Sequence, residues 1–368
     1  MAAGMLSTLV AGISLTGAAA NAASTNWAKV TSAQAGGGMS ALVAAAKKEG
    51  SLNVITLPLA GWANYGAIMK DFTKKYGIKI NDANPNGSSA QEILAIQQGV
   101  GRSSAPDVVD VGTSYATTNL NLWAPYKVAT WNAIPAASKD ASGRWFDDYG
   151  GYVSIGCNTK IVTTCPTSFK ALANPMYKGQ VGINGDPTQA SAAFYAVYAA
   201  SVANGGSFSN IQPGIDFFAN LNKIGNYVPG GSAATAASGT TPILVWWDYL
   251  QNGIQATLPS WKVNIPSDAS VAAYYTQAIN AKAPHPAAAR LWEEYLYSVT
   301  GQNLFLQGYA RPIELPTMVA NHTVNTKWLA QLPPAPKGTV TYPTLAQLTA
   351  AKTTVAANWA SALSGSAG

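Results

Sequence analysis

Short apolar strand patterns alternate with amphipathic helix patterns along this chain, and this alternation constrains the fold more than any other feature. Strand patterns are predicted at residues 52–57, 78–80, 107–111, 152–155, 181–183 and 243–246, with helix patterns between them. Strand, helix and strand in this order indicate a parallel sheet in an α/β domain. Because the order begins again near the middle of the chain, we expect two α/β units.

Local signals mark where several helices begin and end. Ser89, with Glu92 three residues later, predicts a capping box that opens one helix. Asp186 as N-cap, with Pro187 in the first helical position, predicts the start of another. A final helix is expected after Leu345, followed by a tail of small residues.

The N-terminus is typical of an exported protein. Residues 5–15 are apolar and uncharged, and Ala20-Asn21-Ala22 fits an A-x-A cleavage site, although the basic n-region is missing. A membrane anchor is the alternative, but a spanning helix needs roughly 20 apolar residues and this run is too short. We therefore predict a signal peptide at residues 1–22 and a soluble, periplasmic mature protein.

Composition and cysteine spacing exclude some classes of protein. The net charge of +6 is spread without a basic block, so nucleic-acid binding is not expected. Cys157 and Cys165 lie eight residues apart, and in an oxidising compartment they predict a disulfide, with two free thiols as the alternative. No metal site is expected, because His285 and His322 are far from both cysteines in the sequence.

Several segments, in this order, resemble one known family. They are residues 42–52 (LVAAAKKEGSL), 105–109 (APDVV), 157–160 (CNTK), 166–172 (PTSFKAL), 177–179 (YKG) and 283–292 (APHPAAARLW) with Gly301-Gln302. Together they are similar to the extracellular solute-binding proteins of bacterial ABC importers, in the branch that holds ferric-ion, polyamine and phosphonate binders. The resemblance covers roughly residues 41–315.

The resemblance implies a type II periplasmic-binding-protein fold, in which two α/β lobes face each other across a ligand cleft and are joined by crossing strands. The expected crossings lie near residues 145–156 and 262–284. The expected units are lobe 1 (41–150, with about 265–320), lobe 2 (151–264) and a C-terminal helical segment with its tail (321–368). The implied partners are a small-molecule ligand and the permease subunits of an importer. The protein is expected to be a monomer without a cofactor.

The candidate ligand residues lie in loops at strand ends, where a pocket of aromatic walls and a few polar groups is expected. They are Trp62, Asn64, Tyr65, Ser88, Ser89, Thr113, Ser114, Tyr115, Asp186, Thr188, Trp247, Asp248, Tyr249 and Tyr275. Ser89 and Asp186 have helix capping as the alternative role. Because side chains alternate along a strand, only one of Trp246 and Trp247 can face the cleft.

The tryptophans at 246–247 bear on the ligand class. Ferric-ion binders of the family carry paired tyrosines at this place, and indole rings do not ligate iron. We therefore expect an amine-bearing solute, such as a polyamine, held between aromatic walls with Asp248 as counter-charge. Ferric ion, a phosphonate, a carboxylate and a sugar are the alternatives. An anionic group could bind at the helix starts near Thr188 and at Ser88-Ser89.

A secreted hydrolase is the rival class of protein. The G-x-S-x-G motif is absent, and neither histidine has the sequence context of a catalytic triad. Glu293-Glu294 is expected on the solvated face of a helix rather than as a glycosidase pair. We therefore predict a receptor without catalytic residues.

Overall fold

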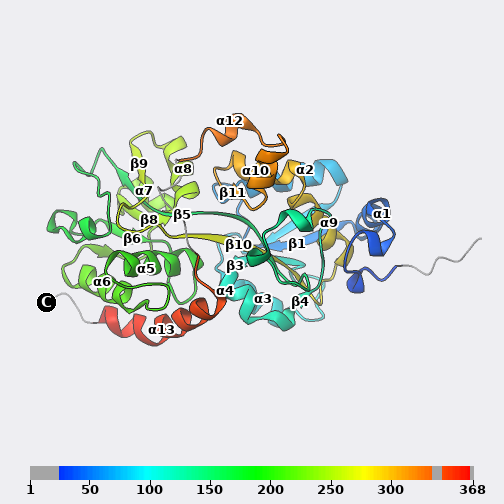
Figure 1. The fold of residues 1–368 in the computed structure, drawn as a ribbon, viewed down its shortest axis with the longest axis horizontal. Coiled ribbons are helices and arrows are strands. Elements are labelled where there is room, and N and C mark those ends of the chain that lie inside the picture. Colours follow the sequence, from blue (N-terminus) through cyan, green and yellow to red (C-terminus); the bar gives the residue numbers. More distant parts are fainter. Residues whose placement is uncertain (1–24, 334–341, 365–368) are drawn as a thin grey trace, which may run out of the picture.

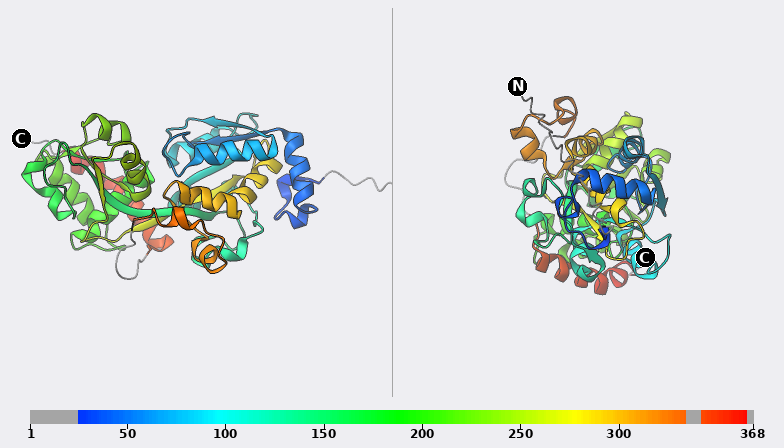
Figure 2. Two further views of the ribbon diagram at one scale, coloured as in Figure 1. Left: turned by 90° about the horizontal axis from the view of Figure 1, so that it is seen from above. Right: turned by 90° about the vertical axis from the view of Figure 1, so that its right-hand side faces the viewer.

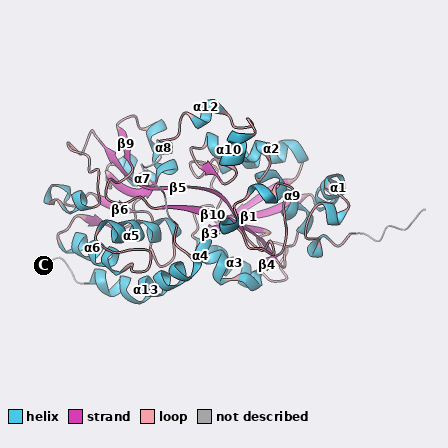
Figure 3. Ribbon diagram, in the orientation of Figure 1, coloured by secondary structure: helices cyan, strands magenta, loops and turns pink. Residues whose placement is uncertain are grey.

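The computed structural model describes residues 25–333 and 342–364, so the predicted signal peptide lies outside the described residues. Two α/β bodies, lobe 1 and lobe 2, lie end to end along the longest axis of the molecule (Figure 1, and from above in Figure 2). Two long strands, β5 (Phe146–Asn158) and β10 (Ala272–Asn280), run between the lobes, and helices lie outside the sheets (Figure 3). The predicted fold of two α/β lobes with crossing strands is confirmed.

Lobe 1 contains the first strand–helix units and the segment after β10. Its strands are β1 (Ser51–Ile55), β2 (Lys79–Ala83), β3 (Val108–Gly112), β4 (Trp123–Ala124) and β11 (Arg311–Pro312). Its helices are α1 (Met39–Glu49), α2 (Tyr65–Tyr76), α3 (Ser89–Gln98), α4 (Thr113–Thr118), α9 (Pro286–Leu296), α10 (Val299–Gln307), α11 (Leu315–Ala320) and α12 (Thr326–Leu329). α1 and α2 stop at Gly50 and Gly77, whose φ values of 71° and 72° are left-handed and suit glycine.

Lobe 2 is built around β8, which pairs in parallel with β6 and antiparallel with β5. Its strands are β6 (Val181–Ile183), β7 (Tyr227–Val228), β8 (Ile243–Trp247) and β9 (Trp261–Asn264). Its helices are α5 (Ser191–Ala203), α6 (Gln212–Lys223), α7 (Ala233–Ser238) and α8 (Asp248–Thr257). Short 3-10 helices in the two lobes span Trp27–Lys29, Gln34–Gly36, Leu120–Leu122, Trp131–Ala133, Ala136–Ser138, Lys170–Ala173 and Pro175–Tyr177.

Strand β5 belongs to the sheets of both lobes. Its first half pairs with β10 and β11, and the register reaches Tyr152 opposite Ala272. Its second half pairs with β8 and β9, beginning with Val153 opposite Trp247. One continuous strand therefore connects the two cores.

Two predicted helix starts are wrong by one to a few residues. The capping box of α3 is formed by Ser88 and Gln91, one residue before the predicted pair. Ser89 is instead buried and its Oγ accepts a hydrogen bond from the Gly112 amide at 3.2 Å. Asp186 caps a turn through the Thr188 amide at 2.7 Å, and α5 begins only at Ser191. Short-range capping chemistry fits both registers, and packing selects one.

The predicted last helix is present as α13 (Leu345–Ser364). It lies along α6 of lobe 2, with the Trp359 and Phe218 ring centroids 5.8 Å apart (Figure 1). It also reaches lobe 1, where the Lys352 ammonium lies 3.2 Å from the centroid of the Tyr115 ring. Burial lowers the pKa of Lys352 to about 8.

The predicted disulfide between Cys157 and Cys165 is confirmed. It ties the end of β5 to the loop that follows, across a separation of eight residues. Closing a loop of this size stabilises the folded state by about 2–3 kcal/mol in the chain-entropy model.

The expectation for Glu293 and Glu294 is wrong, because both side chains are buried. Glu294 accepts hydrogen bonds from the Tyr126 hydroxyl at 2.8 Å and the Ala129 amide at 3.0 Å. Burial, together with nearby acidic groups, raises the pKa of Glu293 well above its usual range. The helix packs on two sides, so its polar positions do not all face solvent.

Candidate ligand-binding site

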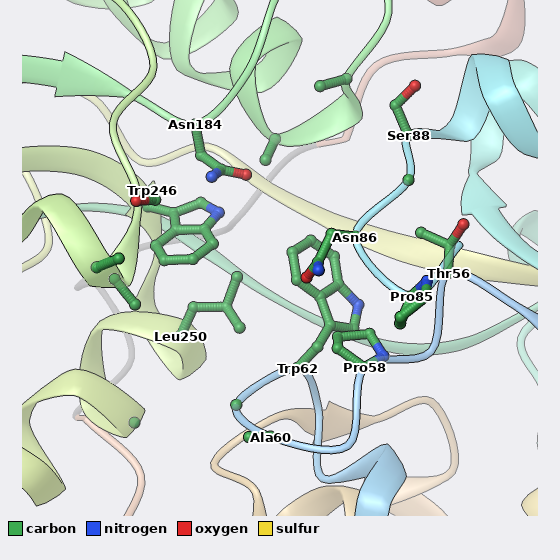
Figure 4. Close-up of a pocket in the computed structure, with 18 of the residues that line it drawn as sticks. Thr56, Pro58, Ala60, Trp62, Pro85, Asn86, Ser88, Asn184, Trp246 and Leu250 are labelled. Carbon is green, nitrogen blue, oxygen red and sulfur yellow. The ribbon is translucent and has the colours of Figure 1, made fainter. Parts of the chain in front are cut away.

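A cavity of about 750 Å³ lies between the two lobes (Figure 4). From lobe 1 and the crossing strand β10 it is lined by Thr56, Pro58, Ala60, Gly61, Trp62, Pro85, Asn86, Gly87, Ser88, Ser89, Glu92, Asp110 and Tyr275. From lobe 2 it is lined by Asn184, Ala190, Ser191, Ala192, Ser232, Ala233, Ala234, Ala237, Trp246, Leu250, Gly253, Ile254, Thr257 and Leu258. Its volume falls in the range of small-molecule sites.

Many of the residues that line the cavity lie in loops that follow the ends of strands. Thr56 follows β1, the 85–89 loop connects β2 to α3, and Asn184 follows β6. In open α/β sheets, ligands bind beyond the carboxyl ends of the strands. The same rule acts in both lobes, so the two sets of loops meet across one cavity.

An aromatic cluster forms part of the wall. The Trp62 ring centroid lies 6.3 Å from that of Trp246 and 5.4 Å from that of Tyr275. The Trp62 Nε1–H donates to the Tyr149 hydroxyl at 2.7 Å, which fixes the ring. The two indoles touch each other across the lobes, so they form one continuous aromatic surface rather than two separate walls.

Two buried carboxyl groups, Glu92 and Asp110, lie on the lobe 1 side. Glu92 Oε2 accepts the Asp110 amide at 3.1 Å, and Asp110 Oδ2 accepts the Tyr149 hydroxyl at 2.8 Å. Asp110 Oδ1 has no hydrogen-bond partner among the described residues. Burial raises the pKa of Asp110 to about 7, and burial with the neighbouring Asp110 charge raises the pKa of Glu92 well above its usual range. Both carboxyl groups therefore hold a proton more tightly than a solvent-exposed carboxyl group does.

Thr56 is held in an unfavourable backbone conformation at the cavity. Its φ of 63° is left-handed, which is rare for a β-branched residue. Its Oγ1 is buried without a hydrogen-bond partner in the described part of the chain. Strain of this kind costs about 1–3 kcal/mol and is concentrated at functional sites.

Four of the predicted ligand residues line the cavity: Trp62, Ser88, Ser89 and Tyr275. Trp247 does not, because its ring packs into lobe 2 against Tyr195, at 5.4 Å between centroids. Its neighbour Trp246 faces the cavity instead (Figure 4). Side chains alternate along β8 as expected, but Trp246 faces the site where Trp247 was predicted to.

The predicted role of Asp248 as a counter-charge in the site is not supported. Its carboxylate is buried, pairs with the Arg311 guanidinium and accepts the Tyr152 amide at 2.9 Å. Burial raises the pKa of Asp248, while the charge of Arg311 opposes that shift. The carboxylate is already neutralised by an ion pair outside the cavity lining.

Two predicted residues from the first loop are committed to lobe 1 packing. Asn64 donates to the Leu304 carbonyl at 2.8 Å. The Tyr65 hydroxyl donates to Asp148 at 3.2 Å, and its ring is fully buried. Neither residue lines the cavity.

None of the other predicted residues lines the cavity. Thr113 donates to Asp147 at 3.2 Å, and Ser114 is buried at the start of α4. The Tyr115 hydroxyl donates to the Thr188 carbonyl at 3.1 Å, which links the lobes beside the site. Asp186 accepts the Thr188 amide, as described above. Tyr249 lies behind Trp62, with the rings edge to face at 6.3 Å.

Several lining residues were not among the predicted set, chiefly Thr56, Glu92, Asp110, Asn184 and Trp246. One signal was available for Asp110, which interrupts the apolar run of residues 107–111 at a position expected to be buried. For Glu92 the sequence pattern predicts only a helix-capping role. Positive φ at Thr56 has no sequence signal, since threonine rarely adopts it.

The described residues contain no group of three or more His, Cys, Asp or Glu side chains arranged to hold a metal ion. In the same part of the chain, no helix combines the length and apolar character needed to cross a membrane.

Residues 107–363 match the family model described as bacterial extracellular solute-binding protein. The fold is similar to that of the periplasmic binding protein P5PA (TM-score 0.70, 16% identity, 85% of this chain and 99% of that chain). It is also similar to AfuA from Actinobacillus pleuropneumoniae with fructose-6-phosphate bound (TM-score 0.69, 16% identity, 86% and 99%). A third similar structure is a putative spermidine/putrescine ABC transporter protein from Listeria monocytogenes (TM-score 0.61, 12% identity, 84% and 99%). The chain belongs to the bacterial extracellular solute-binding protein family.

Proposed function

We propose that the protein is the solute-binding component of an ABC importer, and that it captures an amine-bearing organic molecule outside the cytoplasmic membrane. The observation that carries the ligand class is the pair of buried carboxyl groups, Glu92 and Asp110, beside the indoles of Trp62 and Trp246. Among the described residues that line the cavity, none is Lys, Arg or His. The balance of charge therefore favours a cation.

The aromatic surface and the carboxyl groups have different roles. A cation over an indole face gains about 0.5–2 kcal/mol. A carboxylate supplies a charge-assisted hydrogen bond, which is stronger than a neutral one in a site that excludes water. Asp110 Oδ1 supports this role because it accepts no hydrogen bond from the described residues.

Capture is proposed to involve closure of the lobes. We propose that residues 41–150 with about 265–320, and residues 151–264, move as units about β5 and β10, with residues 321–368 as a C-terminal segment. Hinge motion is the usual means by which two-lobed receptors enclose a ligand. The permease subunits of the importer would then receive the closed form.

A receptor is favoured over a hydrolase by the surroundings of His285. Its Nδ1 lies 2.9 Å from Asp107 Oδ2, at the base of α9, and the residue does not line the cavity. The ring therefore has a structural partner and no access to a ligand in this cavity.

A thermal-shift screen tests the proposal. Diamines, amino acids, phosphonates, carboxylates, sugars and ferric ion are compared, each followed by mass analysis of the recovered ligand. At 100 times its dissociation constant a ligand stabilises the folded state by about 2.7 kcal/mol. We expect stabilisation by amine-bearing compounds that are recovered unchanged. Stabilisation only by sugars, anions or metal ions, or conversion of the ligand, would refute it.

A further inference from the structure

The two walls of the cavity differ in chemistry. The lobe 1 wall carries Glu92 and Asp110, and one oxygen of Asp110 is buried without a partner among the described residues. On the lobe 2 wall, the described lining residues include no Asp or Glu. Acidic side chains therefore oppose an anionic group at the lobe 1 wall but not at the lobe 2 wall.

The lobe 2 wall offers hydrogen-bond donors. Trp246 is 8% exposed, and its Nε1–H has no acceptor in the described part of the chain. Figure 4 shows the nitrogen edge of this indole turned toward the space between the lobes, beside Asn184. A buried indole N–H usually finds a partner, so this one is available to a ligand.

Helix α5 begins on the same wall. It is 13 residues long, and its N-cap, Ala190, has no side chain that accepts from the first turn. The amides of Ser191 and Ala192, which line the cavity, have no acceptor among the described residues. The first amides of a helix and its dipole together favour an anion. Ser191, Ala192 and Trp246 line the same cavity from lobe 2.

The register of the sheet places Asn184 beside Trp246. Ile183 pairs with Val245 in the parallel β6–β8 ladder, so Asn184 and Trp246 stand at the next position along it. The Asn184 amide nitrogen donates to the Gly231 carbonyl at 3.0 Å, which holds this side chain against the loop before α7. The ladder and this hydrogen bond therefore hold Asn184 in place beside the Trp246 indole.

We infer that the solute is amphoteric, with its ammonium group toward Asp110 in lobe 1 and an acid group toward the Trp246 Nε1–H and the first amides of α5 in lobe 2. This inference rests on the proposed function, since it assigns the second pole of the same ligand. A diamine would leave the Trp246 N–H without an acceptor. A diacid would bring negative charge against Glu92 and Asp110. Only a ligand with both groups satisfies both walls when the lobes close.

Calorimetric titration with five-carbon probes tests the inference. The probes are 5-aminopentanoate, 1,5-diaminopentane and pentanedioate, with shorter and longer homologues of each. We expect the amino acid of best length to bind about ten- to a hundredfold more tightly than the diamine of the same length, the gain expected from one hydrogen bond to a charged group.

Variants locate the two poles. Trp246→Phe keeps an aromatic ring but removes the N–H, so it should weaken the amino acid and leave the diamine nearly unchanged. Asp110→Asn should weaken both. Trp62→Phe is the matched control: it shrinks a ring in the same cluster, but its N–H already donates to Tyr149. It should weaken both amine probes to a similar degree.

Two outcomes overturn the inference and are distinguishable. If the diamine binds at least as tightly as the amino acid, and Trp246→Phe affects both equally, the second pole is absent and the amine receptor stands. If only the diacid binds, or no amine-bearing probe binds, the proposed ligand class fails together with the inference.

Discussion

Replacing Asp110 with asparagine should make the ligand-free protein more stable while weakening ligand binding. Asp110 is 4% exposed, and burial raises the pKa of its carboxyl group from 3.8 to about 7. Asparagine has nearly the same shape and its carbonyl can still accept the Tyr149 hydroxyl. The substitution therefore removes a buried charge without removing the known hydrogen bond.

The magnitude follows from the pKa. A shift from 3.8 to about 7 corresponds to at most about 4 kcal/mol of cost for the ionised group in the folded state. The new amide NH₂ needs acceptors, and an unsatisfied buried donor costs about 1–3 kcal/mol. We expect a net gain of about 1–3 kcal/mol in the free energy of unfolding at pH 8.

The sign of the pH dependence is fixed by proton linkage. Between about pH 4 and pH 7, the folded protein holds the Asp110 proton more tightly than the unfolded chain does. The contribution of this group to stability is therefore full below about pH 4, declines as pH rises toward 7, and is constant above that. The advantage of Asp110→Asn should grow from pH 5 to pH 8.

Urea unfolding followed by circular dichroism at pH 5 and pH 8 measures this difference. The midpoint should rise at pH 8 with an unchanged slope, which indicates altered stability rather than an altered unfolded state. Asp248→Asn is the control: it weakens a buried ion pair with Arg311 and should destabilise the protein. A difference between Asp110→Asn and wild type that is the same at both pH values, or a loss of stability at pH 8, would refute the reasoning.

Other predictions concern the disulfide, closure and the site. Thiol titration of the unfolded, non-reduced protein should find no free thiol from Cys157 and Cys165; two thiols per chain would contradict the disulfide. Small-angle scattering should show a smaller radius of gyration with ligand, and an unchanged envelope at saturation would indicate a rigid site. Thr56→Gly should relieve the strain at φ 63° and raise the free energy of unfolding by about 1 kcal/mol, unlike Thr56→Ala, as measured by urea unfolding. Trp247→Ala should cost about 3–5 kcal/mol of stability by the same assay, whereas Trp246→Ala should chiefly weaken binding in calorimetry; equal effects would contradict their assigned faces.

Local patterns were sufficient to predict the two α/β units. The apolar run at 243–246 and the helix that stops at Gly77 both appear in the structure within a residue or two. These patterns depend on side-chain periodicity and on glycine conformations, which are properties of neighbouring residues. The strand that joins the lobes was placed through a family resemblance, since periodicity alone does not reveal which sheet a strand enters.

The site depended on contacts between distant segments. The sequence showed that Trp246 and Trp247 face opposite ways, but the packing of Trp247 against Tyr195 decided which ring reaches the cavity. Asp248 follows β8 and is available by its local sequence, but Arg311, 63 residues away, pairs with it in the fold. Whether a polar side chain is free to bind a ligand depends on partners that folding brings from other parts of the chain. The spacing of neighbouring residues does not predict these partners. Neighbouring residues therefore suffice to predict most of the strands and helices and the disulfide pair, whereas packing between distant segments sets which faces and which charges remain open to a solute.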